Sequence, residues 1–352
     1  MRELRKLNPD ISFFGIGCDN MQSLGVRLLE RMDRHAIVGV WEIVRSLGFI
    51  RDLFRRFAEE VSREKPDLAV LIDYPGFNLE LAKMLYKKNI PCVYYITPQL
   101  WAWGGWRIHA IKKLIKKVIV IFKFEETFFK NAGVDASFVG HPLLDERHTA
   151  CEREKTVSSL GLNPDVFTIG LLPGSRPLEI NRILPPMIQS ARLIQKKKTC
   201  QFIIFKSPNV DKNIYDSICG GFNAHIIESH VYDLLGVTDF VMAASGTATL
   251  QVAIAEKPML ITYITSPITY FLAKLFVRIP LIGLVNIISG GETVPEIIQL
   301  DATPEHLAST ALNIIEYPEK IEEMKRNLRK IKELLGSPGA SERAAKIIAA
   351  YL

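Results

Sequence analysis

The sequence lacks the features that mark secreted, zinc-binding or membrane-spanning proteins. Its five cysteines are scattered and never occur as C-x-x-C, which argues against a disulfide framework or a zinc site and favours a reducing compartment. No long apolar run follows the basic residues at the N-terminus, so a secretory signal is not expected. The longest uncharged stretches of the C-terminal half, Val241–Ala255 and Pro258–Ala273, are shorter than the roughly 20 residues that span a bilayer. The sequence therefore predicts a cytoplasmic protein without a transmembrane helix.

Common cofactor motifs are missing as well. The absence of G-x-G-x-x-G argues against a nicotinamide enzyme, and the absence of G-x-x-x-x-G-K-[ST] argues against an ATPase. No D-x-D pair is present to hold a divalent ion on a nucleotide diphosphate. His141 has no His or Cys at ligand spacing, so it is interpreted as part of a turn. Neither a metal nor another cofactor is expected.

Length and charge set further limits. A chain of 352 residues, against about 100–200 per domain, predicts two domains. The net charge of +6 favours anionic partners such as phosphates or acidic lipid headgroups. A surplus of this size does not indicate nucleic-acid binding, and no such partner is expected.

Short aliphatic runs alternate with longer amphipathic stretches along the chain, which is typical of an α/β fold with parallel sheets covered by helices. The charged, turn-rich segment His141–Asp165 predicts the boundary between an N-terminal domain, residues 1–145, and a C-terminal domain, residues 146–352. Two helices expected within Pro318–Leu352 are assigned to the second domain as solvated caps. Strands are expected at Ser12–Gly15, Ile37–Val40, Leu68–Ile72, Val93–Ile96, Val118–Phe122, Ser137–Val139, Thr168–Leu172, Gln201–Phe205, His225–Ile227, Phe240–Ala243 and Met259–Tyr263.

Two loops in the second half have the composition of anion-binding turns. They are Pro173–Arg176 and Ser245–Thr249, and each follows a predicted strand. Helix starts at the carboxyl ends of parallel strands offer free N–H groups to phosphates, and Arg176 adds a guanidinium. Each loop alone is at least as compatible with ordinary turn and N-cap chemistry. The pair is more informative and predicts a diphosphate site.

Two loops in the first half carry acidic or aromatic side chains. Asp73 follows the strand Leu68–Ile72, where a carboxylate facing a cleft would suit a general base. On these residues alone, an ordinary turn Asp is the favoured interpretation. Trp101, Trp103 and Trp106 crowd a later post-strand loop. Such clusters usually pack a core or loop, but they also form platforms for sugars or acyl chains.

Seven motifs follow one another along nearly the whole chain: Ile72-Asp73-Tyr74-Pro75-Gly76-Phe77-Asn78, Pro98-Gln99-Leu100-Trp101-Ala102-Trp103, Phe122-Lys123-Phe124-Glu125, Val139-Gly140-His141-Pro142-Leu143, Leu172-Pro173-Gly174-Ser175-Arg176, Ser245-Gly246-Thr247-Ala248-Thr249-Leu250 and Pro295-Glu296-Ile297-Ile298-Gln299. In combination they are far more specific than any single loop. Together they resemble the lipid-A-disaccharide synthase family.

The resemblance implies a GT-B glycosyltransferase with two Rossmann-like domains whose parallel sheets face each other across a cleft. The N-terminal domain would bind the acceptor lipid and the C-terminal domain the UDP-sugar. The implied reaction transfers 2,3-diacylglucosamine from UDP-2,3-diacylglucosamine to 2,3-diacylglucosamine 1-phosphate. It inverts the anomeric centre, forms a β-1,6 linkage, releases UDP and requires no metal.

The same resemblance assigns roles to individual residues. Asp73 is the candidate base for the acceptor 6-hydroxyl, and Gln251 stands where the family usually has a ribose-binding Glu. The candidate UDP-sugar residues are Gly174, Ser175, Arg176, Ser245, Gly246, Thr247, Thr249, Gln251, Tyr263, Asn286 and Glu296. The candidate acceptor-side residues are Asn78, Gln99, Trp101, Trp103 and Arg107.

Acylated substrates imply a peripheral protein on the cytoplasmic face of the inner membrane; a homodimer is left open. An apolar entry surface beside basic groups is expected at Ile50–Phe57, with Arg51, Arg55 and Arg56, or at Tyr270–Leu284, with Lys274 and Arg278. Either stretch is equally compatible with an amphipathic helix packed on its own domain, which is the commoner case.

The sequence departs from the family pattern at several points. The family's first strand and its Gly-Glu-x-Ser-Gly-Asp loop are absent, and Cys18-Asp19 stands where Gly-Gly is usual. Gln251 replaces Glu, Val285 replaces Pro, and Ile264 occupies a position that is often basic. We therefore expect an N-terminal domain that lacks its first strand–loop–helix unit, with impaired activity.

Two alternative functions remain at this point. One is another UDP-sugar transferase of the same architecture, such as a peptidoglycan-type N-acetylglucosaminyltransferase. The other is a non-catalytic remnant that binds nucleotide sugars.

Overall fold

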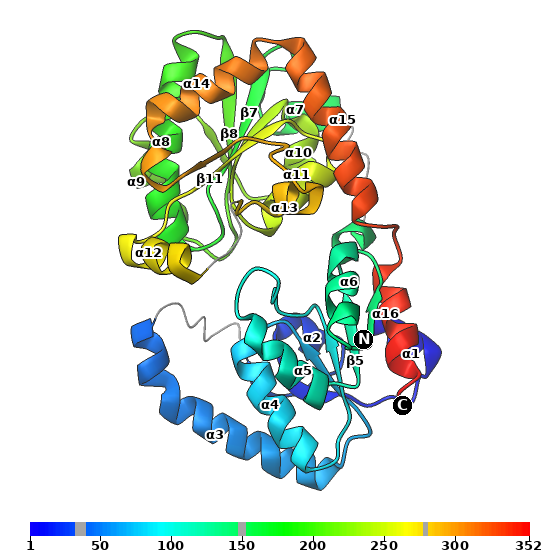
Figure 1. Cartoon of the computed structure of the whole chain (residues 1–352). Coiled ribbons are helices and arrows are strands. Elements are labelled where there is room, and N and C mark those ends of the chain that lie inside the picture. The colour runs from blue at the N-terminus through cyan, green and yellow to red at the C-terminus, as the bar shows by residue number, and fades with distance from the viewer. Residues whose placement is uncertain (32–39, 147–152, 277–280) are drawn as a thin grey trace. The chain divides into compact units, whose positions relative to one another are not determined.

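The computed structural model describes residues 1–31, 40–146, 153–276 and 281–352, and the chain folds into two compact units (Figure 1). Residues 1–145 and 337–352 form the first unit, and residues 146–336 form the second. Each unit contains one main parallel sheet. None of the helices in the described ranges is long and apolar enough to cross a membrane.

The first unit is built on a four-stranded parallel sheet and a separate parallel strand pair. Its strands are β1 (Phe14–Gly17), β2 (Arg27–Arg31), β3 (Ala69–Ile72), β4 (Cys92–Tyr95), β5 (Lys117–Val120) and β6 (Ala136–Phe138). Its helices are α1 (Arg2–Leu7), α2 (Asp19–Ser23), α3 (Val40–Glu64), α4 (Pro75–Lys87), α5 (Ile108–Leu114), α6 (Lys123–Asn131) and α16 (Ala340–Ala349), with 3-10 turns η1 (Gly105–Arg107) and η2 (Pro142–Asp145). The four strands lie in the order β3-β4-β5-β6.

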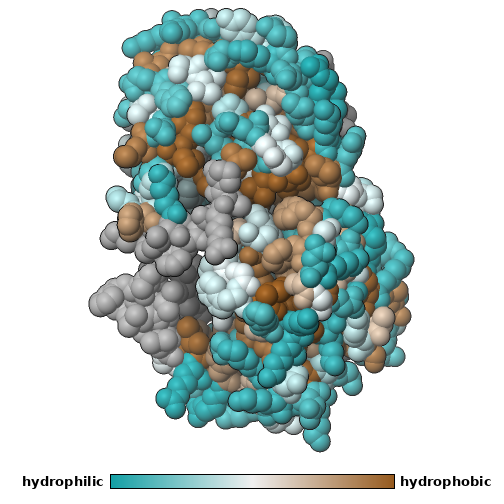
Figure 2. All heavy atoms as spheres, viewed as in Figure 1, coloured by the Kyte–Doolittle hydropathy of each residue, from teal (hydrophilic) through white to brown (hydrophobic). Residues whose placement is uncertain are grey.

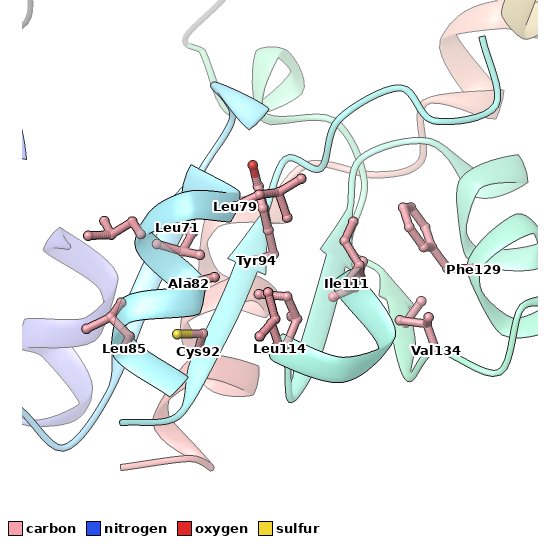
Figure 3. Close-up of a cluster of buried hydrophobic side chains, with 14 of the residues drawn as sticks. Leu71, Leu79, Ala82, Leu85, Cys92, Tyr94, Ile111, Leu114, Phe129 and Val134 are labelled. Atoms are coloured by element: carbon pink, nitrogen blue, oxygen red, sulfur yellow. The ribbon is translucent and has the colours of Figure 1, made fainter. Parts of the chain in front are cut away.

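The central strands of this sheet are buried on both faces. Tyr94 of β4 joins a cluster with side chains of α4 and α5, and Figure 3 shows it near Leu79 and Ala82 of α4. Val93 and Ile119, which point to the opposite face, join a second cluster with α1 and α16. Double-sided burial explains why the strand sequences are continuously apolar rather than alternating.

The helix α16 packs on the first unit, which corrects the assignment of all residues after 145 to the second domain. Its residues Ala344, Ala345 and Ile348 are buried together with Leu4 of α1 and Val93 of β4. The expectation of a solvated cap missed this contact because the apolar stripe of α16 is short and lies between charged positions. The preceding helix belongs to the second unit.

Asp145 links the start of α16 to the end of η2. Its Oδ1 accepts hydrogen bonds from the backbone N–H groups of Gly339 at 2.6 Å and Ala340 at 3.0 Å. Its Oδ2 accepts a bond from the N–H of Ser341 at 2.8 Å. The first N–H groups of a helix have no partner within the helix, and its dipole favours a negative charge there. Asp145 therefore holds the C-terminal helix on the first unit.

We expect Asp145→Ala to lower the free energy of unfolding by about 1–3 kcal/mol, because three helix-start amides lose their acceptor. Chemical denaturation measures the change. Glu342→Ala is the matched control on the same helix, since among the described residues Glu342 forms an exposed ion pair with Lys346, and its removal should have little effect. Equal losses in the two variants would contradict the role assigned to Asp145.

The second unit is built on a six-stranded parallel sheet. Its strands are β7 (Phe167–Leu172), β8 (Cys200–Phe205), β9 (His225–Ile227), β10 (Phe240–Ala244), β11 (Met259–Tyr263) and β12 (Glu296–Ile298). Its helices are α7 (Arg153–Ser159), α8 (Pro177–Gln195), α9 (Lys212–Cys219), α10 (Val231–Val237), α11 (Thr247–Ile254), α12 (Pro267–Phe276), α13 (Leu284–Ser289), α14 (Pro304–Ile315) and α15 (Pro318–Leu334), with a 3-10 turn η3 (Gln299–Asp301). The helix α15 buries Met324, Leu328 and Ile331, and its outer surface is largely hydrophilic (Figure 2).

The strand order of this sheet, β12-β11-β10-β7-β8-β9, contains a topological switch point. From β7 the chain adds β8 and β9 on one side, and then returns to place β10, β11 and β12 on the other. The loops that leave β7 and β10 therefore diverge from neighbouring strands at one edge of the sheet. In open parallel sheets this edge is where ligands bind.

Most predicted strands lie within two residues of the observed ones, with Ser12–Gly15 shifted to β1 at Phe14–Gly17. The strands β2 and β12 are absent from the prediction. In β2, charged residues interrupt the apolar run, and β12 begins with the charged Glu296 and has only two apolar residues, Ile297 and Ile298. Of the strand expected at Ile37–Val40, residues 37–39 lie outside the described residues, and Val40 is the first residue of α3.

Candidate active site

The loop after β7 is shaped by Glu179, a residue that the sequence analysis did not select. Its Oε2 accepts a hydrogen bond from the Ser175 N–H at 3.0 Å. Gly174 has a φ of +113°, and a Cβ atom there would lie 2.6 Å from the same oxygen, so only glycine fits. Glu179 is the third residue of α8, a position from which an acidic side chain commonly accepts hydrogen bonds from the free amides at the helix start. Its place three residues after Arg176 is the feature of the sequence that could have predicted this role.

Arg176 projects from the same loop towards solvent. Its side chain is 62% exposed, and its Nη1 lies 3.7 Å from Oε1 of Glu179, which is too long for a strong hydrogen bond. The guanidinium can therefore turn towards an anion above the loop without breaking a tight ion pair.

The loop after β10 brings the start of α11 to the same edge. Gly246 has a φ of +154° and a ψ of −166°, a conformation that is essentially restricted to glycine. The Ser245 hydroxyl donates to the carbonyl of Ile282 at 3.1 Å. Thr249 is fully buried and its hydroxyl donates to the Gly246 carbonyl at 2.8 Å, so it holds the turn, whereas Gly246 and Thr247 are exposed.

Tyr263, at the end of β11, lies in the same charged environment. Burial raises the pKa of its hydroxyl, the Glu179 charge raises it further, and the charges of Arg176 and Arg182 oppose the shift. Gln251 is half-buried one turn into α11. The ends of β7, β10 and β11 thus bring most of the predicted UDP-sugar residues to one edge of the second unit.

Asn286 and Glu296 are also predicted UDP-sugar residues, but their polar atoms are engaged inside the unit. Glu296 accepts hydrogen bonds from the N–H groups of Ile282 at 2.8 Å and Gly283 at 2.9 Å, and from Asn286 Nδ2 at 2.7 Å. Asn286 is fully buried, and its Oδ1 accepts bonds from Thr293 and Val294. The pair fixes the segment before β12, which also carries the Ile282 carbonyl that Ser245 binds.

In the first unit, Asp73 occupies a strained turn directly after β3. Asp73 and Tyr74 both have positive φ values, +48° and +46°, which cost of order 1–3 kcal/mol each for residues other than glycine. The Asp73 carbonyl accepts hydrogen bonds from Asn78 Nδ2 at 2.6 Å and from the Tyr94 hydroxyl at 2.7 Å. Asn78 also donates to the Ile72 carbonyl at 2.9 Å. The Asp73 side chain is exposed, so its carboxylate faces solvent. Its backbone carbonyl, in contrast, is fixed by the hydrogen bonds from Asn78 and Tyr94.

The loop after β4 carries the other predicted acceptor-side residues. The Gln99 carbonyl accepts bonds from the N–H groups of Ala102 at 3.0 Å and Trp103 at 3.3 Å, which closes the turn. Trp101 is half-buried, and its Nε1 donates to Oε1 of Glu125 at 3.1 Å. Arg107 lies against the exposed Trp103 ring. Trp101 is therefore part of the loop's packing, while Trp103 and Arg107 lie nearer the surface.

Glu125 is a buried carboxyl at the start of α6, only 2% exposed. Burial raises its pKa to about 7, although the hydrogen bond from Trp101 and those from the backbone of Phe122 and Ile121 act in the opposite direction. The folded state therefore favours the protonated form between the ordinary carboxyl pKa and pH 7. Because the native protein binds this proton more tightly than the unfolded chain, stability is highest at low pH in this window and falls as the pH rises.

We expect Glu125→Gln to remove this part of the pH dependence while keeping an acceptor for Trp101. The stability of the variant relative to the parent should rise from pH 5 to pH 8 by a few kcal/mol, on the order of 1.4 kcal/mol per unit of pKa shift. Urea denaturation at the two pH values measures it. The buried His141, whose pKa burial lowers to about 4, is common to both proteins and cancels. A constant difference between the variants would contradict the raised pKa.

The stretches expected to meet a membrane are partly engaged in internal contacts. Arg55 pairs with Asp52 at 2.6 Å, and Arg56 pairs with Glu30 at 2.7 Å, while Phe57 is buried in the core. For the part of α3 in this stretch, the structure thus supports the alternative of an amphipathic helix packed on its own unit. In the second stretch, Phe271 is 69% exposed and Lys274 lies over the Tyr270 ring, and Arg278 lies outside the described residues.

No three His, Cys, Asp or Glu side chains are grouped as metal ligands among the residues that the structure describes. His141 is buried, its Nδ1 accepts a bond from the Leu143 N–H at 3.2 Å, and its ring packs on Phe122. A cavity of about 450 Å³ lies at the other end of the second sheet, beside Phe167, Thr238 and Pro258, and contains none of the predicted site residues.

Sequence comparison relates the whole chain to one group of proteins. A family model described as lipid-A-disaccharide synthetase matches residues 1–350. A lipid-A-disaccharide synthase of Geobacter sulfurreducens is 37% identical over 351 residues, which cover 99% of this chain and 91% of the relative. Another, from Syntrophus aciditrophicus, is 39% identical over 345 residues and covers 97% and 90%. These matches give no support to the expected impairment of activity.

Solved structures show the same architecture at low sequence identity. UDP-GlcNAc 2-epimerase from Neisseria meningitidis, solved with UDP-GlcNAc bound, has a TM-score of 0.64 and 14% identity over 96% of this chain and 99% of that one. MurG from Acinetobacter baumannii has a TM-score of 0.56 and 12% identity over 97% and 100%. Likeness at this level shows the fold alone, an α/β protein with two parallel-sheet domains of the GT-B type.

Proposed function

Because the chain belongs to the lipid-A-disaccharide synthase family, we propose that it transfers 2,3-diacylglucosamine from UDP-2,3-diacylglucosamine to 2,3-diacylglucosamine 1-phosphate and releases UDP. Lipid-A-disaccharide synthase activity makes the protein a glycosyltransferase of lipid A biosynthesis. The full-length match to the family carries this conclusion over the peptidoglycan-type alternative, for which there is only a likeness of fold. It likewise disfavours the non-catalytic remnant.

Asp73 is proposed as the base that accepts the proton of the acceptor 6-hydroxyl. An inverting displacement needs this base on one side of the anomeric carbon while the leaving group departs from the other. The exposure of the carboxylate supports the assignment, and so does the fixed turn beneath it, which Asn78 and Tyr94 hold through the Asp73 carbonyl. A base held on a rigid turn loses little entropy when the substrate arrives.

Arg176 and the start of α11 are proposed to stabilise the departing diphosphate. Charge grows on the diphosphate as the glycosidic bond breaks, and fixed donors at that position stabilise the transition state more than the ground state. The exposed Arg176 guanidinium and the exposed Gly246–Thr247 turn at the switch point support this role. Gln251, further along α11, is proposed to bind the ribose of UDP.

Peripheral contact with the cytoplasmic face of the inner membrane is proposed from the substrates and from the first unit's surface. Four large apolar side chains, each at least 44% exposed, lie at the end of β3 and in the loops after β3 and β4: Ile72 and Tyr74 on either side of Asp73, and Trp103 and Trp106. Exposed aromatic side chains near a site for acylated sugars suit the boundary between water and lipid.

We expect Asp73→Asn to reduce turnover by roughly 10²–10⁴-fold without unfolding the protein, because the amide cannot accept the hydroxyl proton. Release of UDP in the presence of both diacylated substrates measures it. Glu80→Gln is the matched control, since Glu80 is an exposed acid on the helix that follows Asp73 and pairs only with Lys83 in the described structure. Turnover of UDP-N-acetylglucosamine with an unacylated acceptor would support the peptidoglycan-type alternative, and UDP binding without turnover would support the remnant.

We expect Arg176→Ala to raise the dissociation constant of UDP about tenfold to 100-fold, the range for losing a hydrogen bond to a charged group. Titration calorimetry measures it. Lys196→Ala removes one positive charge just beyond the far end of α8 and serves as the control for long-range attraction. Equal affinities in Arg176→Ala and the parent would remove Arg176 from the diphosphate site.

A further inference from the structure

Arg107 is held in an unusual arrangement at the edge of the first unit. Its guanidinium carbon lies 4.6 Å from the ring centre of Trp103 and 5.3 Å from that of Trp106. Gly104, with a φ of +70°, leaves room for it, because a Cβ atom there would lie 3.3 Å from Nη1. Two aromatic faces and a glycine thus fix the position of a planar cation before any ligand binds.

The charge of Arg107 has no partner in the part of the chain that the structure describes. Its Nη1 is buried and makes no hydrogen bond with any described residue, and no described carboxylate forms an ion pair with it. A guanidinium cannot lose its proton, and a buried charged donor without a partner is costly. Because Nη1 itself is buried, an anion would meet the half-buried guanidinium on its other N–H groups and offset the charge there.

Asp73 and Arg107 act on the same neighbour. The Tyr94 hydroxyl donates to the Asp73 carbonyl at 2.7 Å. Its pKa is raised, mainly by burial; a hydrogen bond with Asn78 opposes the shift, the Asp73 charge adds to it, and the Arg107 charge opposes it. The turn that carries Asp73 and the loop that leads to Arg107 leave paired strand ends, because Ile72 of β3 pairs with Tyr95 of β4 and the Asp73 N–H donates to the Ile96 carbonyl at 3.1 Å.

We propose that Arg107, held between Trp103 and Trp106, binds the phosphate group of the acceptor and so orients the sugar whose hydroxyl faces Asp73. This rests on the proposed function, in which the acceptor is a sugar 1-phosphate with a reacting hydroxyl on C6. In a pyranose, C1 and C5, which carries C6, flank the ring oxygen, so the phosphate and the C6 hydroxyl lie at the same edge of the ring. A base and a cation on the neighbouring loops after β3 and β4 match that arrangement. The cation also offsets the repulsion between the phosphate and the Asp73 carboxylate.

The test compares two acceptors, 2,3-diacylglucosamine 1-phosphate and the same lipid without its phosphate. We expect Arg107→Ala to lower kcat/KM for the phosphorylated acceptor about tenfold to 100-fold, mainly through KM, and to leave the weaker use of the dephosphorylated acceptor nearly unchanged. Arg107→Gln, which keeps length and polarity but not charge, should give the same pattern and serves if the alanine variant does not fold. Lys113→Ala removes an exposed charge from α5 nearby and should alter neither acceptor.

The outcomes separate this proposal from its alternatives. Equal losses with both acceptors, or no loss with either, would overturn it. Loss of binding to vesicles of anionic phospholipid, with the preference between acceptors intact, would also overturn it and assign Arg107 to a membrane headgroup. The proposed function fails in a different way, since the parent protein would then use neither diacylated acceptor. UDP affinity should be the same in every Arg107 variant, because Arg176 and the UDP loops belong to the other unit.

Discussion

Because all strands of a parallel sheet run in one direction, every loop proposed to carry chemistry in this protein leaves the carboxyl edge of its own sheet. In the second unit, the switch between β7 and β10 separates two neighbouring loops and opens the space for a ligand. In the first, the turn after β3 and the loop after β4 supply an acid, aromatic rings and a cation. The fold therefore decides where chemistry can occur before any side chain is considered.

A second group of side chains, whose polar atoms are engaged in hydrogen bonds within the protein, gives these loops their shape. Asn78 holds the Asp73 turn, Glu179 holds the Gly174 turn, and Glu296 with Asn286 holds the segment that contacts Ser245. Each satisfies backbone groups that a tight turn would otherwise leave unpaired, at positions where unmade hydrogen bonds cost free energy. For Asn286 and Glu296, a motif identifies residues that matter to the site without showing whether they touch the substrate.

The sequence was enough to predict the α/β class, most strands and the two loops at the switch point, because these depend on local apolar runs and on glycine and proline. It was not enough to place α16, because its few buried alanines are recognisable as core residues only once they are seen packed against the first sheet. Nor could it show that Glu125 is buried beneath Trp101, or that Thr249 turns inward while Thr247 is exposed. Those facts depend on packing between segments far apart in the chain, which periodicity does not encode.

The charges of the second unit illustrate why packing matters for function. A carboxylate beside the proposed diphosphate site is unfavourable, because its negative charge repels that of the diphosphate. Glu179 is tolerated there because it takes the Ser175 amide as a partner and lies 3.7 Å from the Arg176 guanidinium. This arrangement requires a tight turn, in which Gly174 lies so close to the Glu179 side chain that no Cβ atom fits at that position. As a result, the Arg176 guanidinium points outward and makes only a long contact with the Glu179 carboxylate. It can therefore exchange this contact for one with a more highly charged anion.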